Sequence, residues 1–238
     1  MSTGVRSRSR SPLSREIILD AAMRRVRTSG RRSLAQLGRE LGADPTAMYR
    51  HYRGKDEFLR GMADRVYGEA LAEIDDTLWN GPWRVVLHEL EWAIRRVYLQ
   101  YPGLAVDMAP RFTGGENERL LSERLRHLLR VAGLDPVAAS RYSRVVSELT
   151  LGLLLITAWL MTLPPSMKIL DAEIGLRLYP EVHPPTSGGD DSDALDDEEF
   201  TFALALDAML DGVGDAVALA AAGRASVAGG DVARGATP

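Results

Sequence analysis

Apolar residues recur along most of this chain with the spacing of amphipathic helices. In residues 14–28 they lie three or four positions apart and form one stripe: Ile17, Ile18, Ala21, Ala22 and Val26. A stripe of this period predicts a helix that packs on one side, and Ser29-Gly30 is expected to end it. No segment of any length alternates in the manner of a strand. The pattern therefore predicts an all-α protein.

The next three segments have the pattern of a helix-turn-helix followed by a long helix. Residues 33–41 predict a short helix, and Gly42 suits the chain reversal at its end. Asp44 can cap the following helix, 45–52, whose first turn tolerates the proline that begins it. After Arg53-Gly54, a fourth helix is expected from about Lys55 to Leu78.

The rest of the chain is expected to be helical as well, in segments at 83–101, 104–108, 117–132 and 136–164 and from about residue 198. The segment 83–101 carries apolar residues on two opposed sides, which predicts a helix surrounded by others. Residues 184–199 are rich in Pro, Gly, Ser and Asp and predict a mobile acidic loop. Residues 1–13 predict a disordered basic arm, and the Gly- and Ala-rich residues 223–238 a disordered tail.

Charge is divided unequally between the two parts of the chain. Residues 1–60 carry 14 Lys and Arg against 6 Asp and Glu, whereas the rest of the chain carries 15 against 27. A basic segment attached to an acidic body is the arrangement that attracts phosphate to one end of a protein. The charge pattern therefore favours nucleic-acid binding by the N-terminal part.

Composition excludes several other classes of protein. The chain has no cysteine, which excludes disulfides and cysteine-ligated zinc or iron–sulfur sites. No apolar segment follows the Arg- and Ser-rich N-terminus, so a signal peptide is not expected. The apolar run 149–163 contains three threonines and is too short to span a bilayer. We therefore expect a soluble cytoplasmic protein.

The segments between Ser14 and Leu59 carry a family resemblance. They are Ile18-Leu19-Asp20-Ala21-Ala22, Gly30, Ser33-Leu34, Leu37-Gly38-Arg39-Glu40-Leu41-Gly42, Met48-Tyr49-Arg50-His51-Tyr52 and Lys55-Asp56-Glu57-Phe58-Leu59. In these residues and their spacing the chain resembles the TetR family of transcriptional regulators. The departures are Gly38, where the family usually has alanine, and Ala43, where it usually has valine or isoleucine. Residues 200–212 resemble, more weakly, the last helix of members like the tetracycline repressor.

The resemblance implies an N-terminal helix-turn-helix DNA-binding domain, residues 14–60, joined by a long helix to a helical effector-binding and dimerisation domain, residues 61–222. It also implies the residues that contact DNA: Thr46, Ala47, Tyr49, Arg50, His51 and Lys55. Tyr49 and His51 are expected on phosphates, and Arg50 is the main candidate for specificity because a guanidinium can pair bidentately with guanine. Lys55 combines an ammonium group with a helix N-terminus, and both attract phosphate.

Dimerisation and effector binding are expected in the second domain. One recognition helix makes few contacts, whereas a two-fold pair reads a palindromic operator with half-sites about 34–36 Å apart. We expect the homodimer to form through the helix at 136–164 and the last helix. Candidate effector-binding residues are largely apolar with a few polar groups: His88, Trp92, Arg95, Met108, Phe112, Tyr142 and Trp159. The resemblance implies that a small-molecule effector shifts the DNA-binding domains and releases the operator.

Two other classes remain as alternatives. A helical metal-dependent enzyme would have to use the acidic run between Asp190 and Glu199, but no nucleophile–base pair, Gly-rich phosphate loop or HExxH motif accompanies it. The four histidines are scattered without metal-ligand spacing: His51, His88, His127 and His183. A helical interaction protein that does not bind DNA would leave the basic N-terminal unit unexplained. We therefore expect a regulator that is not an enzyme and needs no cofactor or metal.

Overall fold

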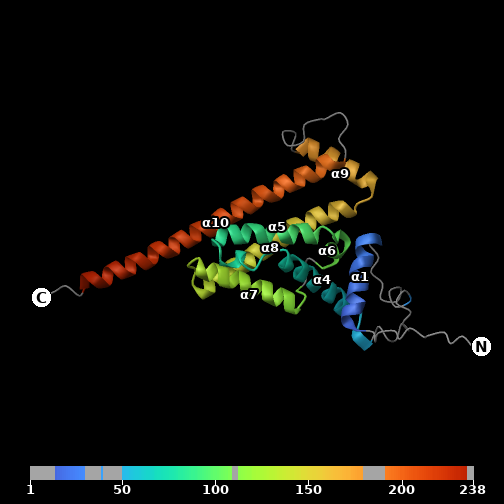
Figure 1. Cartoon of the computed structure of the whole chain (residues 1–238). Helices are drawn as coiled ribbons and strands as arrows, with labels where there is room; N and C mark the ends of the chain where they lie inside the picture. Colours follow the sequence, from blue (N-terminus) through green and yellow to red (C-terminus); the bar gives the residue numbers. More distant parts are fainter. Residues whose placement is uncertain (1–13, 30–38, 40–49, 109–111, 179–190, 235–238) are drawn as a thin grey trace, which may run out of the picture.

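The computed structural model describes residues 14–29, 39, 50–108, 112–178 and 191–234, and in these residues it contains helices and no strands (Figure 1). The all-α prediction is confirmed. The expected helices at 33–41 and 45–52 lie outside the described residues, except for Arg39, Arg50 and His51, which are helical, and Tyr52, which is not. The helices are α1 (Arg15–Ser29), α4 (Lys55–Ala72), α5 (Trp83–Tyr98), α6 (Pro102–Met108), α7 (Glu116–Val131), α8 (Pro136–Thr162), α9 (Pro165–Leu178) and α10 (Asp191–Arg234), with a 3-10 turn, η1 (Leu78–Asn80).

Helix ends follow the capping residues in the sequence. At the start of α8 the Asp135 carboxylate accepts hydrogen bonds from the backbone N–H groups of Val137 and Ala138, at 2.8 and 3.0 Å, and Pro136 occupies the first turn. At the start of α1, Ser14 Oγ accepts from the Ile17 N–H at 3.2 Å. Gly133, after α7, has a φ of 114°, which a residue with a side chain rarely adopts.

The fourth helix is shorter than the sequence predicted. It ends at Ala72 rather than near Leu78, and the chain turns before η1. The Asp75 carboxylate accepts from both the N–H and the hydroxyl of Thr77, at 2.7 and 2.6 Å. Such a local side-chain bond competes with the helical hydrogen bonds and favours a turn.

Three segments after α8 also differ from prediction. Helix α9 was not predicted, although the proline at its first position is a common helix start. The expected acidic loop is helical from residue 191, where α10 begins, because aspartates in a first turn are stabilised by the helix dipole. The expected disordered tail is helical up to Arg234, since alanine, which is frequent there, is the strongest helix former.

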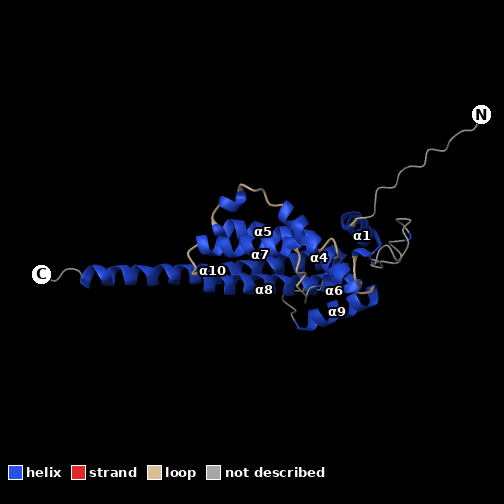
Figure 2. Ribbon diagram, turned by 90° about the horizontal axis from the view of Figure 1, so that it is seen from below, coloured by secondary structure: helices blue, strands red, loops and turns tan. Residues whose placement is uncertain are grey.

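Helix α5 lies inside the body, as its two apolar sides predicted. It packs against α4, α7, α8 and α10, and nine of its residues are buried. Helix α1 lies at one end of the body, packed on α4 (Figure 1). Helix α10 lies along α5 and α8 and then extends well beyond the body, away from α1 (Figure 2). This arrangement makes α4 the element that contacts both α1 and the helices of the body.

Candidate DNA-binding surface and effector site

The end of the expected recognition helix is anchored to α1 and α4 through Tyr52. Its side chain is fully buried, packs edge-on against Phe58 at 5.2 Å between ring centroids, and donates a hydrogen bond to the Arg15 carbonyl at 3.3 Å. The Arg15 guanidinium lies 4.4 Å from the centre of the Tyr52 ring and pairs with Glu57 at 3.0 Å. The segment that carries Arg50 and His51 is therefore held from its C-terminal end.

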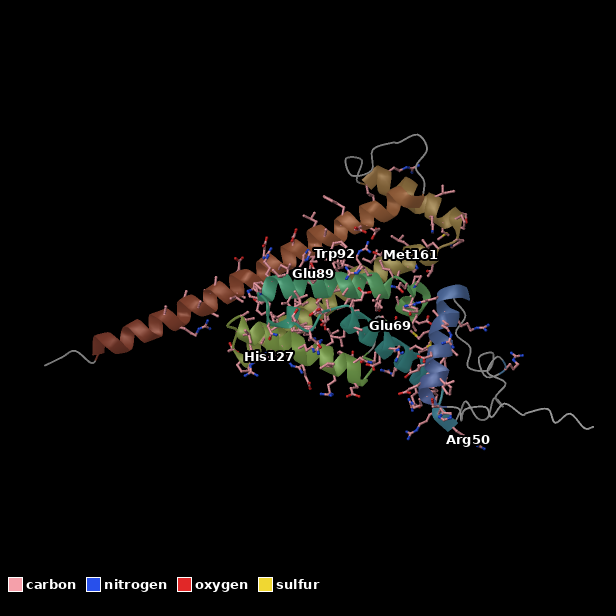
Figure 3. The ribbon with its side chains drawn as sticks, in the orientation of Figure 1. Arg50, Glu69, Glu89, Trp92, His127 and Met161 are labelled. Carbon is pink, nitrogen blue, oxygen red and sulfur yellow. The ribbon has the colours of Figure 1, made fainter. Side chains whose placement is uncertain are left out.

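Three of the six predicted DNA-contacting residues lie in the described part of the chain. Arg50 is exposed at the end of the molecule where α1 lies (Figure 3), and His51 is partly exposed. Lys55 is exposed and is the first residue of α4. The N-cap of α4 is Gly54, which makes no side-chain capping hydrogen bond, so the lysine ammonium group lies beside a helix N-terminus that its own cap residue does not neutralise.

The other three predicted DNA contacts, Thr46, Ala47 and Tyr49, lie outside the described residues. Close to Lys55, the Arg53 N–H donates to Glu57 at 2.7 Å. This hydrogen bond and the pairing with Arg15 lower the pKa of Glu57. The Glu57 carboxylate therefore stays ionised and bound to Arg15 and Arg53 of its own chain, close to Lys55.

A small cavity lies between α4, α5 and α6. Its volume is about 10 Å³, which is room for about one water molecule. The lining is mostly apolar, with three tyrosines and a threonine: Ala63, Val66, Tyr67, Tyr98, Tyr101, Leu104, Ala105 and Thr113. A larger ligand would have to separate these helices in order to enter.

A hydrogen-bonded cluster connects this cavity to α1. The Tyr101 hydroxyl donates to Glu69 of α4 at 2.8 Å, and Arg27 of α1 donates to the same Glu69 oxygen at 2.9 Å. The Arg27 guanidinium also lies 4.9 Å from the centre of the Tyr101 ring. Figure 3 shows Glu69 on α4, between the body and α1. A residue of the cavity wall therefore contacts the N-terminal helix both directly, through the Arg27 guanidinium, and through the Glu69 carboxylate.

Asp64 of α4 ties the cavity to α7. Its carboxylate accepts from the backbone N–H groups of Asn117 and Glu118, at 3.3 and 3.0 Å, and so caps α7 from another helix. Thr113, which lines the cavity, donates to Asp64 at 3.3 Å and to Glu118 at 2.9 Å. Gly115 is needed here, because a Cβ atom would lie 2.1 Å from the Asp64 carboxyl group.

Three of the predicted effector-binding residues lie together, at a different place from the cavity. Trp92 donates to His88 at 3.1 Å and packs edge-on against Phe202 of α10 at 5.2 Å. The Arg95 guanidinium lies 5.8 and 5.4 Å from the ring centres of Trp92 and Phe202. They form a cluster between α5 and α10, and their role in ligand binding stays a prediction.

The other four predicted effector-binding residues are not brought to one site. Phe112 is 76% exposed and Trp159 is 43% exposed, so both lie at the surface of the protomer. Tyr142 is partly buried on α8, and the side chain of Met108 lies outside the described residues. None of the six whose side chains are described lines the cavity. The sequence pattern did place Tyr98 and Tyr101 on one face of the predicted helix at 83–101, but as core residues.

Helix α8 carries an apolar stripe that the rest of the chain leaves exposed. The exposed residues follow steps of four and three along the helix: Val145, Leu149, Gly152, Ile156 and Trp159. Other faces of α8 are buried against the rest of the chain, among them Val146, Ser143 and Thr150. By length and hydropathy α8 as a whole could also span a membrane, with only 28% of its apolar window buried. The run 149–163, which alone is too short to span a bilayer, is therefore only part of a longer apolar helix.

Comparison with known proteins adds a curated relative and solved structures. No family model matches the chain. An HTH-type transcriptional regulator of Saccharopolyspora erythraea is 29% identical over 149 residues, and the match covers 61% of each chain. The chain therefore spans less than two thirds of that relative's length.

Solved structures match the chain as well. ActR, a TetR family protein of Streptomyces coelicolor solved with (S)-DNPA, has a TM-score of 0.64 and 23% identity and covers 87% of this chain and 99% of its own. BioQ, solved with its double-stranded DNA operator, has a TM-score of 0.53 and 25% identity and covers 61% of this chain and 88% of its own. These findings confirm the resemblance seen in the sequence: this chain has the architecture of the TetR-family transcriptional regulators.

Proposed function

We propose that this chain is a transcriptional repressor that binds a palindromic operator as a homodimer and is released by a small-molecule effector. The observation that carries the proposal is the exposed Arg50 followed by the exposed Lys55 at the N-terminus of α4, in the basic part of the chain. The BioQ structure, which contains its DNA operator, supports the same use of this fold. A cation beside a helix N-terminus binds phosphate, and an arginine on the preceding helical segment can pair with base edges.

The test of DNA binding is the substitution Arg50→Ala. We expect it to weaken binding to DNA from upstream of the chain's own gene by roughly 100-fold, because a bidentate arginine–guanine contact contributes about 1–3 kcal/mol and a dimer makes it twice. Fluorescence anisotropy at several salt concentrations measures the affinity. Arg130→Ala, which removes an exposed arginine from α7, should leave it unchanged. Equal affinities for the two variants would contradict the assignment of Arg50.

The apolar stripe on α8 supports the homodimer. Exposed apolar patches of this extent mark interaction surfaces, and a second copy of the same stripe would cover this one by two-fold symmetry. Phe200 and Leu204, more than 60% exposed on α10, add apolar surface on a helix that packs against α8. We infer that α8 and α10 of two protomers form a four-helix bundle.

The cluster of Arg27, Glu69 and Tyr101 supports a route for effector release. Since the cavity holds only about one water molecule, a ligand that enters it must displace its walls, including Tyr101 and α4. Glu69 then moves, and α1 moves with it because Arg27 of α1 is bound to Glu69. We infer that this displacement changes the separation of the two DNA-binding domains, which ligand binding can drive only through a difference in affinity between the two states.

The route predicts an energetic coupling between Tyr101 and Glu69. Tyr101→Phe and Glu69→Gln should each weaken DNA binding about threefold, and the double variant should show a coupling of roughly 0.5–1 kcal/mol, since both remove one network. DNA affinity at fixed salt measures it in a double-mutant cycle. The matched control is Asp20→Asn, which breaks the 3.0 Å pair of α1 with Arg65 of α4. Its effect should add to that of Tyr101→Phe, and full additivity in both cycles would contradict the route.

A further inference from the structure

One acidic side chain in the body is buried without a full set of partners. Glu91 of α5 is 2% exposed, and its Oε2 atom has no hydrogen-bond partner. The Thr150 hydroxyl of α8 hydrogen-bonds the carboxyl group. Buried polar atoms in folded proteins are almost always satisfied, and the exceptions often mark functional groups. Core packing alone therefore does not account for a carboxylate at this position.

The position of Glu91 relates it to the cavity. Glu91 precedes the cavity residue Tyr98 by seven positions, and residues seven apart lie on the same face of a helix. Tyr67 of α4, which also lines the cavity, lies close enough to Glu91 for the two groups to interact electrostatically. Burial is the main reason why the pKa of Tyr67 is raised, and the charge of Glu91 adds to the increase. Glu91 does not line the cavity as it stands, so a ligand that uses both requires that a separation of α4 and α5 extends the cavity along α5 to the Oε2 atom of Glu91.

The chemistry of this extended site restricts its ligand. Ala63, Val66, Leu104 and Ala105 provide apolar surface in the cavity wall, and Glu91 provides an acceptor that nothing in the protein fills. A donor or a cation would satisfy Oε2, whereas an anion would be repelled and an apolar group would leave the oxygen unpaired. We propose that the effector is an organic amine with an apolar body, whose nitrogen donates to Glu91. This inference rests on the proposed release by a ligand.

Three matched probes test the ligand class on the full chain: benzylamine, benzyl alcohol and phenylacetate. Isothermal titration and thermal melts compare the wild type with Glu91→Gln. The control is Glu89→Gln, which removes an exposed carboxylate two residues away on the same helix (Figure 3). We expect benzylamine to bind the wild type and Glu89→Gln more tightly than benzyl alcohol, and phenylacetate not to bind. Glu91→Gln should bind benzylamine at least about tenfold more weakly, as expected for the loss of a charged hydrogen bond.

The results separate this inference from the proposed function. Unchanged benzylamine affinity in Glu91→Gln, equal binding of phenylacetate, or no binding of the amine would each overturn the inference. DNA anisotropy with the same probe is the second measurement. If benzylamine binds through Glu91 but does not weaken DNA binding, the amine site is supported and its role in operator release is contradicted. If a compound releases DNA equally from the wild type and from Glu91→Gln, effector release is supported and the role of Glu91 is overturned.

Discussion

Ile156→Glu is expected to convert the protein from a dimer to a monomer and to weaken DNA binding by about 100-fold. Ile156 is 55% exposed within the apolar stripe on α8. Two-fold symmetry would place two glutamates in one apolar interface, and burying uncompensated charges costs several kcal/mol, each 1.4 kcal/mol being tenfold in affinity. Analytical ultracentrifugation gives the mass of the particle, and anisotropy gives the DNA affinity.

Ser140→Glu is the matched control for this substitution. It introduces the same charge on an exposed position of α8 that lies outside the stripe. We expect this variant to remain dimeric and to bind DNA like the wild type. Circular dichroism of both variants shows whether the helices are retained. A folded Ile156→Glu variant that is still dimeric would mean that the protomers associate through another surface.

The sequence predicted the body helices wherever spacing and capping residues agreed. Asp135-Pro136 predicted the start of α8, and Ser29-Gly30 the end of α1, within a residue or two. It failed where composition suggested loops, because the aspartates of residues 191–199 and the glycines of the tail lie in α10. The abundance of Asp, Gly, Pro and Ser suggested loops, but two other features favour helix in these segments. Aspartates near a helix N-terminus interact favourably with the helix dipole, and alanine, frequent in the tail, is the strongest helix former.

The candidate site was less predictable than the fold, for a physical reason. Periodicity identifies residues that point inward, but a core and a cavity wall are both apolar and inward. Tyr98 and Tyr101 were therefore recognised as buried without being recognised as cavity residues. The contacts of Glu69 and Asp64 join residues more than 30 positions apart in the chain, and no local pattern carries such pairings. The DNA-contacting residues came from the family resemblance.

Glu91→Gln is expected to make the protein less sensitive to rising pH. Burial raises the pKa of Glu91 to about 7, against 4.5 for an exposed glutamate, and the Thr150 hydrogen bond offsets only part of this. The folded state therefore holds a proton on Glu91 between about pH 4.5 and 7 that the unfolded state has released. Stability of the wild type falls as pH rises through this window, whereas glutamine stays neutral at every pH.

The expected size follows from the shift in pKa. Each pKa unit corresponds to about 1.4 kcal/mol, so the free energy of unfolding of Glu91→Gln relative to the wild type should increase by about 2–3 kcal/mol between pH 5 and pH 8. Comparing two pH values cancels any constant cost of burying the amide. Urea unfolding at equal protein concentration measures the difference, since association also contributes to stability.

Glu89→Gln, which replaces an exposed carboxylate, should show a much smaller change. Tyr67, the titratable neighbour on α4, remains neutral throughout because its pKa is raised further above 10. A constant difference between the two pH values would mean that Glu91 is ionised in the folded protein, which requires a partner for Oε2 that the packing of α4, α5 and α8 does not provide.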